Sequence, residues 1–412
     1  MSDTDPASAS SRPLSRPAFR HFVAARFGAS LAYQIVGVAL GWQVYALSGS
    51  ALDLGLIGLA QFLPMAVLTL AVGHVADRYD RRRIVAVCMA IEACAALVLA
   101  VAALHGFGGR ALLYTTIVVM SSARAFEAPT LPALLPAVVP RAWIPRATAL
   151  STSTNQAALI AGPSLGGVGY GLGAGWVYCA AAAMYLVGFL CIATLVIERA
   201  PPRKEVTTLR TLFAGITFIV QRRVLLGTLS LDLFAVLLGG ATALLPIYAK
   251  DILHAGPWAL GALRASPACG AVLMALLLAR RDMLSGNVGG MLFGALMVFG
   301  VATVVFGLST SIPLSVLALA ALGAADAISV VVRSSLVQLN TPDAMLGRVS
   351  AVNTLFVGTS NQLGEFRAGL SAAALGAVPA VVLGGVGTLA VACLWMWWFP
   401  ELRRLRSLHA AA

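Results

Sequence analysis

The chain alternates between long apolar stretches and short polar connections. Each apolar stretch has about 20 to 27 residues, which at a helical rise of about 1.5 Å per residue is enough to cross about 30 Å of hydrocarbon. This pattern predicts membrane-spanning helices rather than the amphipathic helices of a water-soluble protein. We expect twelve spans, at residues 22–47, 54–76, 83–104, 111–135, 147–170, 175–197, 224–249, 257–279, 287–309, 311–337, 348–373 and 377–399.

Composition supports this interpretation. Of the 412 residues, 59% are apolar and only 11% are charged, whereas soluble domains carry about 25% charged residues. The mean hydropathy is +0.90. A water-soluble fold could not bury so much apolar surface, and the twelve stretches leave almost no residues for a soluble domain.

The net charge of +12 is explained by membrane topology. If both termini are cytoplasmic, the outer face receives only Arg110 and Lys250, and the other loops and tails that carry basic residues lie inside. This is the positive-inside asymmetry, which favours an even number of spans in the bacterial inner membrane. The lipid bilayer is therefore a sufficient partner for the charge, and we expect no nucleic acid. The inner basic residues include Arg12, Arg16, Arg20, Arg78, Arg83, Arg203, Lys204, Arg222, Arg223, Arg280, Arg281, Arg403, Arg404 and Arg406.

A polar connection from Glu198 to Arg223 divides the spans into six and six. The first 18 residues are rich in Ser and Pro and lack the apolar core of a signal peptide. We expect a disordered cytoplasmic tail at 1–18, a six-helix half at 19–198, a cytoplasmic central loop at 199–223, a second six-helix half at 224–400 and a cytoplasmic tail at 401–412.

The two halves match each other at a constant offset of 202 residues, which is the signal of an internal repeat. The fourth and fifth spans look like copies of the tenth and eleventh. Parallel six-helix halves with a cavity between them near the midplane are typical of major facilitator transporters. We therefore predict an all-α membrane protein with twelve transmembrane helices in two pseudo-symmetric halves. The matched positions are Pro140 with Pro342, Arg146 with Arg348, Ala149 with Ala351, and Gly162–Gly167 with Gly364–Gly369.

The loop between the second and third spans reads Gly73-His-Val-Ala-Asp77-Arg78-Tyr-Asp80-Arg81-Arg82-Arg83. It resembles the G-x-x-x-D-R-x-G-R-R signature of the major facilitator superfamily, with Asp80 at the usual second Gly. The glycine permits close helix approach, the aspartate can face the positive end of a helix, and the arginines can pair with acids or lipid phosphates. The resemblance implies a gating loop, and the alternative is an ordinary basic loop on the inner face.

The fifth span contains Gly162, Pro163, Gly166 and Gly167, with Ala158 four residues before the first of them. It resembles the G-x-x-x-G-P-x-x-G-G motif of exporters in the superfamily, with Ala158 in place of the first Gly. The small residues allow close packing, and Pro163 cannot donate a backbone hydrogen bond, so we expect a bend. The alternative is the close packing found in any membrane helix.

Several segments of the second half resemble the siderophore-exporter group of major facilitator proteins. The resemblance extends over most of the chain and implies proton-driven export, with siderophores among the possible cargoes. Because the same group contains putative drug exporters, it leaves the cargo open. The segments are Leu231–Gly240, Leu245–Asp251, Leu260–Ala265 and Thr359–Phe366.

Ionisable residues at membrane depth are costly and are by default functional candidates. Asp232 and Asp326 lie on the seventh and tenth spans, which line the cavity in this superfamily, and Glu365 lies on the eleventh. No histidine lies at depth, so these three carboxylates are our candidates for proton coupling. In the alternative interpretation Asp232 pairs with an arginine and Arg333 neutralises Asp326. We expect Glu92, on a peripheral span, to be structural.

Four residues are candidates for the substrate cavity. Arg124 lies near the middle of the fourth span with Glu127 on the same face, and Tyr33 and Gln34 lie at mid-depth on the first span. The repeat aligns Arg124 with Asp326, which would place a cation and an anion at equivalent sites. The alternative is that Arg124 and Glu127 pair only with each other.

The leading function is secondary active export of a small amphipathic or anionic molecule, driven by protons. Uptake, broad-specificity multidrug efflux and a non-transporting sensor or scaffold are the alternatives. The sequence contains no G-x-x-x-x-G-K-[ST] loop and no plausible metal cluster or nucleophile and base pair. We therefore expect neither an ATP-driven pump nor an enzyme, and no cofactor or metal. The sequence leaves the oligomeric state open, and a monomer is preferred.

Overall fold

The computed structural model describes residues 13–195, 209–280 and 287–406, and over these residues it is helical throughout, with no strand. Every expected span has a long helix at its place. The spans of the first half are α1 (Pro17–Ser48), α2 (Ala51–Arg78), α3 (Arg81–His105), α4 (Arg110–Thr130), α6 (Ile144–Tyr170) and α7 (Ala174–Ala193). The spans of the second half are α9 (Arg223–Gly239) with its continuation to Ile252, α11 (Pro257–Arg280), α12 (Val288–Leu308), α13 (Ile312–Leu339), α14 (Asp343–Leu375) and α15 (Ala377–Trp398).

Short helices connect or extend these spans. They are η2 (Pro13–Ser15), η3 (Pro132–Leu134), α5 (Leu135–Val138), η4 (Arg141–Trp143), α8 (Leu209–Gln221), η5 (Thr242–Leu244), α10 (Leu245–Ile247), η6 (Tyr248–Ile252) and α16 (Pro400–Arg403).

By length and composition alone, nine stretches of helix in the described part of the chain are apolar enough to cross a membrane. The three expected spans outside this group are α4, α6 and α14. Each of these helices carries polar or charged residues along its length, such as Arg124 on α4, Asn155 on α6 and Glu365 on α14, which lower its hydropathy.

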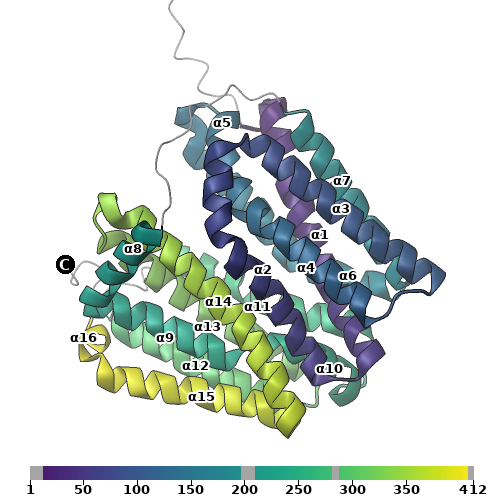
Figure 1. The fold of residues 1–412 in the computed structure, drawn as a ribbon. Coiled ribbons are helices and arrows are strands. Elements are labelled where there is room, and N and C mark those ends of the chain that lie inside the picture. The colour runs from purple at the N-terminus through teal and green to yellow at the C-terminus, as the bar shows by residue number, and fades with distance from the viewer. Residues whose placement is uncertain (1–12, 196–208, 281–286, 407–412) are drawn as a thin grey trace, which may run out of the picture.

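The spans form two bundles, which Figure 1 shows in purple to blue for the first half and green to yellow for the second. The bundles follow the predicted repeat in detail. A Cβ added to Gly162 of α6 would lie 2.5 Å from Cβ of Gln34 on α1, and one added to Gly364 of α14 would lie 3.0 Å from the carbonyl of Val236 on α9. The 202-residue offset relates Gly162 to Gly364 and Gln34 to Val236. The contact of α6 with α1 is therefore repeated in the contact of α14 with α9.

The halves meet at the end of the molecule that is remote from the described chain ends. There α6 packs against α11, and α2 packs against α14. An apolar core at this end includes Val38 and Leu54 from the first half and Leu244 and Leu263 from the second. In Figure 1 the halves diverge toward the opposite end, where α5 and α8 lie.

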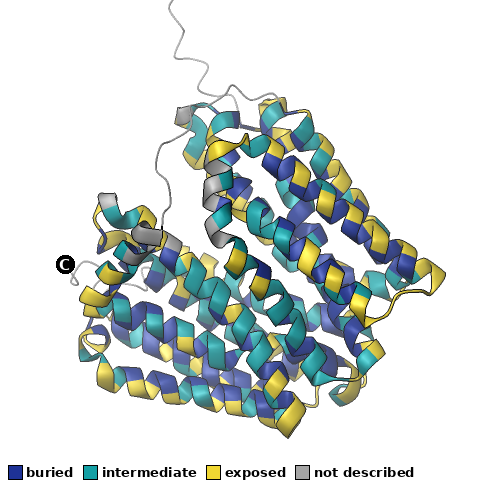
Figure 2. Cartoon of the chain, viewed as in Figure 1, coloured by how far each residue is buried: buried dark blue, intermediate teal, exposed yellow. Residues whose placement is uncertain are grey.

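Large apolar side chains cover the outside of both bundles. Leu97 on α3, Leu186 on α7, Leu276 on α11 and Leu383 on α15 are each about half exposed, and Figure 2 shows exposed residues along α3 and α15. In water such a surface would be a large unpartnered apolar patch. Hydrocarbon tails satisfy it, as expected for a protein embedded in a bilayer.

Two expected boundaries differ from the structure. Helix α1 already begins at Pro17, inside the tail expected at 1–18, because proline suits the first helical position. The expected central loop at 199–223 contains α8, whose Gly215 packs closely against Arg348 and Val352 at the start of α14. Residues 1–12, 196–208 and 407–412 lie outside the described residues.

Candidate functional site

A buried ion pair joins the seventh and tenth spans in the second half. Arg333 of α13 forms a salt bridge with Asp232 of α9, and both side chains are less than a tenth exposed. Ser329, one turn before Arg333, donates a hydrogen bond of 3.5 Å to Oδ1 of Asp232. Spacing along the tenth span suggested Asp326 as the partner of Arg333, but the arginine reaches across to the neighbouring helix instead.

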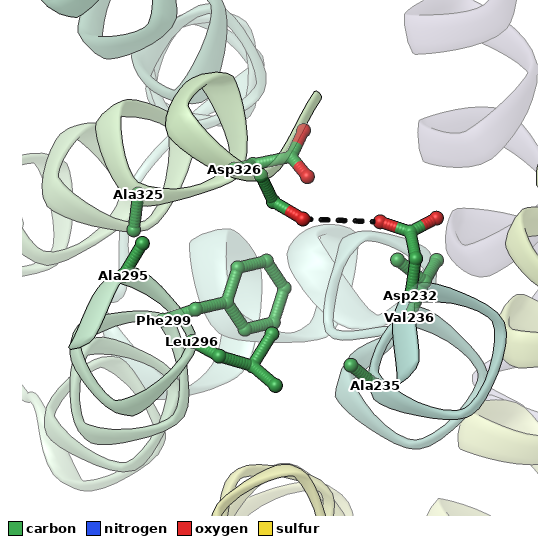
Figure 3. A pocket seen from close by; sticks show the side chains of 9 residues that line it. Asp232, Ala235, Val236, Ala295, Leu296, Phe299, Ala325 and Asp326 are labelled. Carbon is green, nitrogen blue, oxygen red and sulfur yellow. Dashed lines mark hydrogen bonds between the residues drawn. The ribbon is translucent and has the colours of Figure 1, made fainter. Parts of the chain in front are cut away.

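Asp326 lies beside this pair and lines the same small cavity, whose other walls include Phe299 and Ala325 (Figure 3). Its side chain is half-buried. Among the described residues, Asp326 makes no hydrogen bond or ion pair. Of the two aspartates, Asp326 is therefore the one whose negative charge is not balanced by a contacting cation.

The first half contains a second buried cluster around Arg124. Its Nη1 donates a hydrogen bond of 2.5 Å to Oε2 of Glu127, one turn along α4. The guanidinium also lies over the ring of Tyr33 on α1, at 4.8 Å from the ring centre. Glu127 is fully buried, whereas the side chain of Arg124 is 26% exposed. Arg124 thus contacts Glu127 on one side and remains accessible on the other.

A third group of polar residues lies at the seam between the halves. Arg264 of α11 donates a 3.1 Å hydrogen bond from Nη1 to the carbonyl of Gly37 on α1. Thr242 donates a 3.3 Å hydrogen bond to Oε1 of Glu365 on α14. These residues, together with Gln61 of α2, line one cavity. The three predicted proton-coupling residues therefore divide between two places, with Asp232 and Asp326 inside the second half and Glu365 at the seam.

Further contacts between the halves close the seam at the ends of the spans where α1 meets η6. Tyr45 of α1 donates a hydrogen bond to Asp251 of η6. Lys250 lies 5.5 Å from the centre of the Tyr45 ring. Closer to the cavity, a Cβ on Gly167 of α6 would lie 2.7 Å from Cα of Gly261 on α11. Glycine is required here because the two backbones leave no room for a side chain.

The sequence indicated one continuous helix for the seventh span. In the structure this helix breaks after Gly239. Breaking a helix in hydrocarbon leaves carbonyl groups without intrahelical donors. Arg367 of α14 satisfies two of them, donating from Nε to Leu237 at 3.0 Å and from Nη2 to Leu238 at 2.5 Å. Arg367 therefore has a structural partner, while Glu365, two residues earlier, faces the seam.

We expect Arg367→Gln to destabilise the protein by about 3 kcal/mol, because two hydrogen bonds from a charged donor are lost. Two carbonyls at the break in the helix are then left without a donor. The measurement is thermal unfolding in detergent. Arg348→Gln on the same helix is the matched control, since Arg348 is exposed and its side chain makes one hydrogen bond to a described residue, Met345. Equal unfolding temperatures for the two variants would contradict the role of Arg367.

The loop between α2 and α3 holds the ends of two helices together. Asp80 caps α3 by accepting a 2.9 Å hydrogen bond from the backbone of Arg82. Arg82 in turn donates to the carbonyls of Ile192 and Ala193 at the end of α7, at 3.0 Å from Nε to Ile192. The aspartate that replaces the usual glycine is therefore a helix cap. The surroundings of Gly73 and the side chain of Asp77 are not described, and the gating role of the motif, including Arg78, Arg81 and Arg82, stays a prediction.

Comparison with known proteins matches nearly the whole chain to one protein family. Residues 8–410 match the major facilitator family model described as "Transmembrane secretion effector". The chain belongs to this family. It is 28% identical over 400 residues to the enterobactin exporter EntS of Citrobacter koseri, covering 95% of this chain and 94% of the relative. The EntS protein of Escherichia coli O1:K1 / APEC is 27% identical over 394 residues with the same coverage.

Solved structures confirm the fold. A point mutant of the nucleoside transporter NupG matches with a TM-score of 0.74 at 14% identity, covering 93% of this chain and all of that one. A bacterial homolog of the human lysosomal transporter Spinster, in an inward-facing and occupied conformation, matches with a TM-score of 0.73 at 15% identity, covering 96% and 100%. The chain is thus a multi-pass inner-membrane transporter of the major facilitator superfamily.

Within this major facilitator transporter, the predicted packing motif Gly162, Pro163, Gly166 and Gly167 is buried where α6 meets α1 and α11. Gln34 is half-buried beside Gly162. Arg26 was not among the predicted residues, and its Nη1 donates a 2.7 Å hydrogen bond to Ser151. Glu92, for which a structural role was expected, is fully buried near Arg124 and Glu127.

Proposed function

We propose that this transporter exports a small anionic, siderophore-like molecule from the cytoplasm, driven by proton entry. Support for the cargo class comes from the curated relatives, which are named enterobactin exporters, and from the cation that the first half presents. Support for a gradient as the energy source is the absence of a nucleotide-binding loop from the sequence.

The observation that carries the proposal is the environment of Arg124. A guanidinium at membrane depth is costly unless it is paired or faces a polar cavity. Arg124 makes a single hydrogen bond within the described residues, through Nη1 to Glu127. Its remaining N–H groups and its 26% exposed surface are available to an anion or a catechol. The ring of Tyr33 beneath it adds an aromatic surface.

For proton coupling we propose Asp326 as the principal residue in the second half. An ion-driven cycle needs a group whose charge changes between conformations. Asp232 is held by Arg333, whereas Asp326 lines the neighbouring cavity without a contacting cation. Glu365 at the seam is the reserve candidate.

We also propose that both termini are cytoplasmic, because the basic loops lie on the side of the termini. The end at which α6 meets α11 and α2 meets α14 is then periplasmic. In this orientation the described conformation is closed to the periplasm, with Arg124 reached from the cytoplasm. One chain contains both halves, so a monomer is sufficient for the cycle.

The test is transport by the purified protein in proteoliposomes with an imposed pH gradient. We expect enterobactin to accumulate on the side that loses protons, with proton movement dependent on added enterobactin. Ethidium, as a cationic drug, should not be transported. Transport of ethidium with no transport of enterobactin would overturn the cargo class and favour multidrug efflux.

Arg124→Lys should raise the apparent KM for enterobactin about tenfold while leaving the folded protein intact, because lysine keeps the charge but cannot form bidentate contacts. Initial rates in the same proteoliposomes give the KM. Arg110→Lys on the same helix is the control, since Arg110 is 60% exposed at the end of α4. If Arg124→Lys instead lowers the unfolding temperature and leaves KM unchanged, Arg124 serves only to pair with Glu127.

A further inference from the structure

Glu92 of α3 is a carboxyl group enclosed within the first half. Its side chain is 0% exposed. Within the described part of the chain, neither Oε1 nor Oε2 has a hydrogen-bond partner. Fully buried carboxylates are rare unless paired, because an isolated buried charge is unstable away from water. A residue kept in this position without a partner calls for an explanation other than packing.

Charged groups of both signs lie around Glu92. Arg124 is the cation that acts on Glu92, and Glu127 is a second carboxylate close by. Arg124 is already bonded to Glu127 at 2.5 Å. Arg26 acts on Arg124 and Glu127, but its guanidinium bonds to Ser151.

The other titratable groups that interact with Glu92 are phenols and a thiol. The buried Tyr185 hydroxyl on α7 likewise has no hydrogen-bond partner among the described residues. Cys88 lies one turn before Glu92 on α3. Tyr33 of α1 is influenced by the charges of Arg124, Glu92, Glu365 and Arg264. Because the hydrogen bond of Arg124 goes to Glu127, the charge of Glu127 is balanced by a contacting cation and that of Glu92 is not.

We propose that Glu92 is a proton-binding residue of the transport cycle, and that Arg124 decides whether Glu92 or Glu127 carries the proton. In the described conformation the proton sits on Glu92 and Arg124 pairs with ionised Glu127. When Arg124 moves toward Glu92, the proton passes to Glu127, so one O–H bond breaks as another forms and the total charge is unchanged. This inference rests on the proposed proton-driven export.

Glu92→Gln is the decisive variant, because glutamine has the shape and hydrogen-bonding capacity of a protonated glutamate. We expect it to fold like the wild type and to retain exchange of labelled for unlabelled enterobactin across the proteoliposome membrane. Enterobactin-dependent proton flux should fall about tenfold or more. The matched control is Glu401→Gln, which makes the same replacement at an exposed carboxyl paired with Arg223, outside the cluster, and it should keep the wild-type proton flux.

An infrared difference spectrum between wild type and Glu92→Gln tests the protonation state without any cargo. A protonated-carboxyl band that is present in the wild type at pH 7 and lost in the variant is expected. Absence of that band, a normal coupled proton flux in Glu92→Gln, or a strongly lowered unfolding temperature of this variant would each overturn the proposal. If wild type moves no protons with enterobactin while the band is present, the proposed export function fails and the assignment of the proton to Glu92 stands.

Discussion

Asp232→Asn is expected to destabilise the protein by about 3–5 kcal/mol, because it leaves the guanidinium of Arg333 buried without its counter-charge. Both side chains of the pair are less than a tenth exposed, and the hydrogen bond from Ser329 cannot neutralise the arginine. Asp326→Asn, in the same cavity, should change stability little. It should instead abolish enterobactin-dependent proton flux. Thermal unfolding in detergent and flux in proteoliposomes separate the two effects.

The control for this prediction is a double variant. Replacing both partners, as Asp232→Leu with Arg333→Leu, removes the unpaired charge and should recover most of the lost stability, since apolar replacement of a buried pair is often neutral. A loss of less than about 1 kcal/mol in Asp232→Asn alone would show that the pair is unimportant for stability. In that case Asp232 returns as a proton-coupling candidate beside Asp326.

The sequence predicted the fold well because a bilayer limits the possible structures. Only helices of about 20 residues satisfy their backbone groups across hydrocarbon, so apolar stretches correspond directly to spans. The repeat predicted the packing too, since Gly162 and Gly364 contact equivalent positions on α1 and α9. The break after Gly239 was not predicted, because two adjacent glycines are common in continuous membrane helices. In addition, Arg367, which donates hydrogen bonds to the carbonyls freed by the break, lies far along the chain.

The site was harder to predict because spacing within a helix does not reveal partners on other helices. Arg333 and Asp326 share a face of α13, yet Arg333 bonds to Asp232 on α9. A structural role was expected for Glu92 because its span is peripheral in the order of the spans, and this order did not reveal that its side chain is fully buried near Arg124 and Glu127. The distribution of polar residues on α3 gave one usable signal: Glu92 is a lone carboxyl in an otherwise apolar span.

Gly167→Leu is expected to lower transport about tenfold or more without unfolding the protein, because the side chain prevents α6 and α11 from closing the seam. A Cβ here would lie 2.5 Å from the carbonyl of Pro257 and 2.7 Å from Cα of Gly261. The halves must therefore separate at this end, and the conformation closed there loses population. Initial rates of enterobactin transport measure the loss.

The conformational cause can be measured separately from the rate. The background for this experiment is a variant without native cysteines, in which Ala243→Cys places a thiol on the seam cavity. A membrane-impermeant maleimide is added from the periplasmic side. Gly167→Leu should increase the labelling of this thiol. Gly369→Leu should do the same, because Gly369 is the repeat equivalent of Gly167 and a Cβ on its partner Gly55 would lie 2.9 Å from it. Gly294→Leu on α12 is the control, since an added Cβ meets no atom within 4 Å. If labelling and transport in Gly167→Leu match those of Gly294→Leu, close approach of α6 and α11 is not what closes the seam.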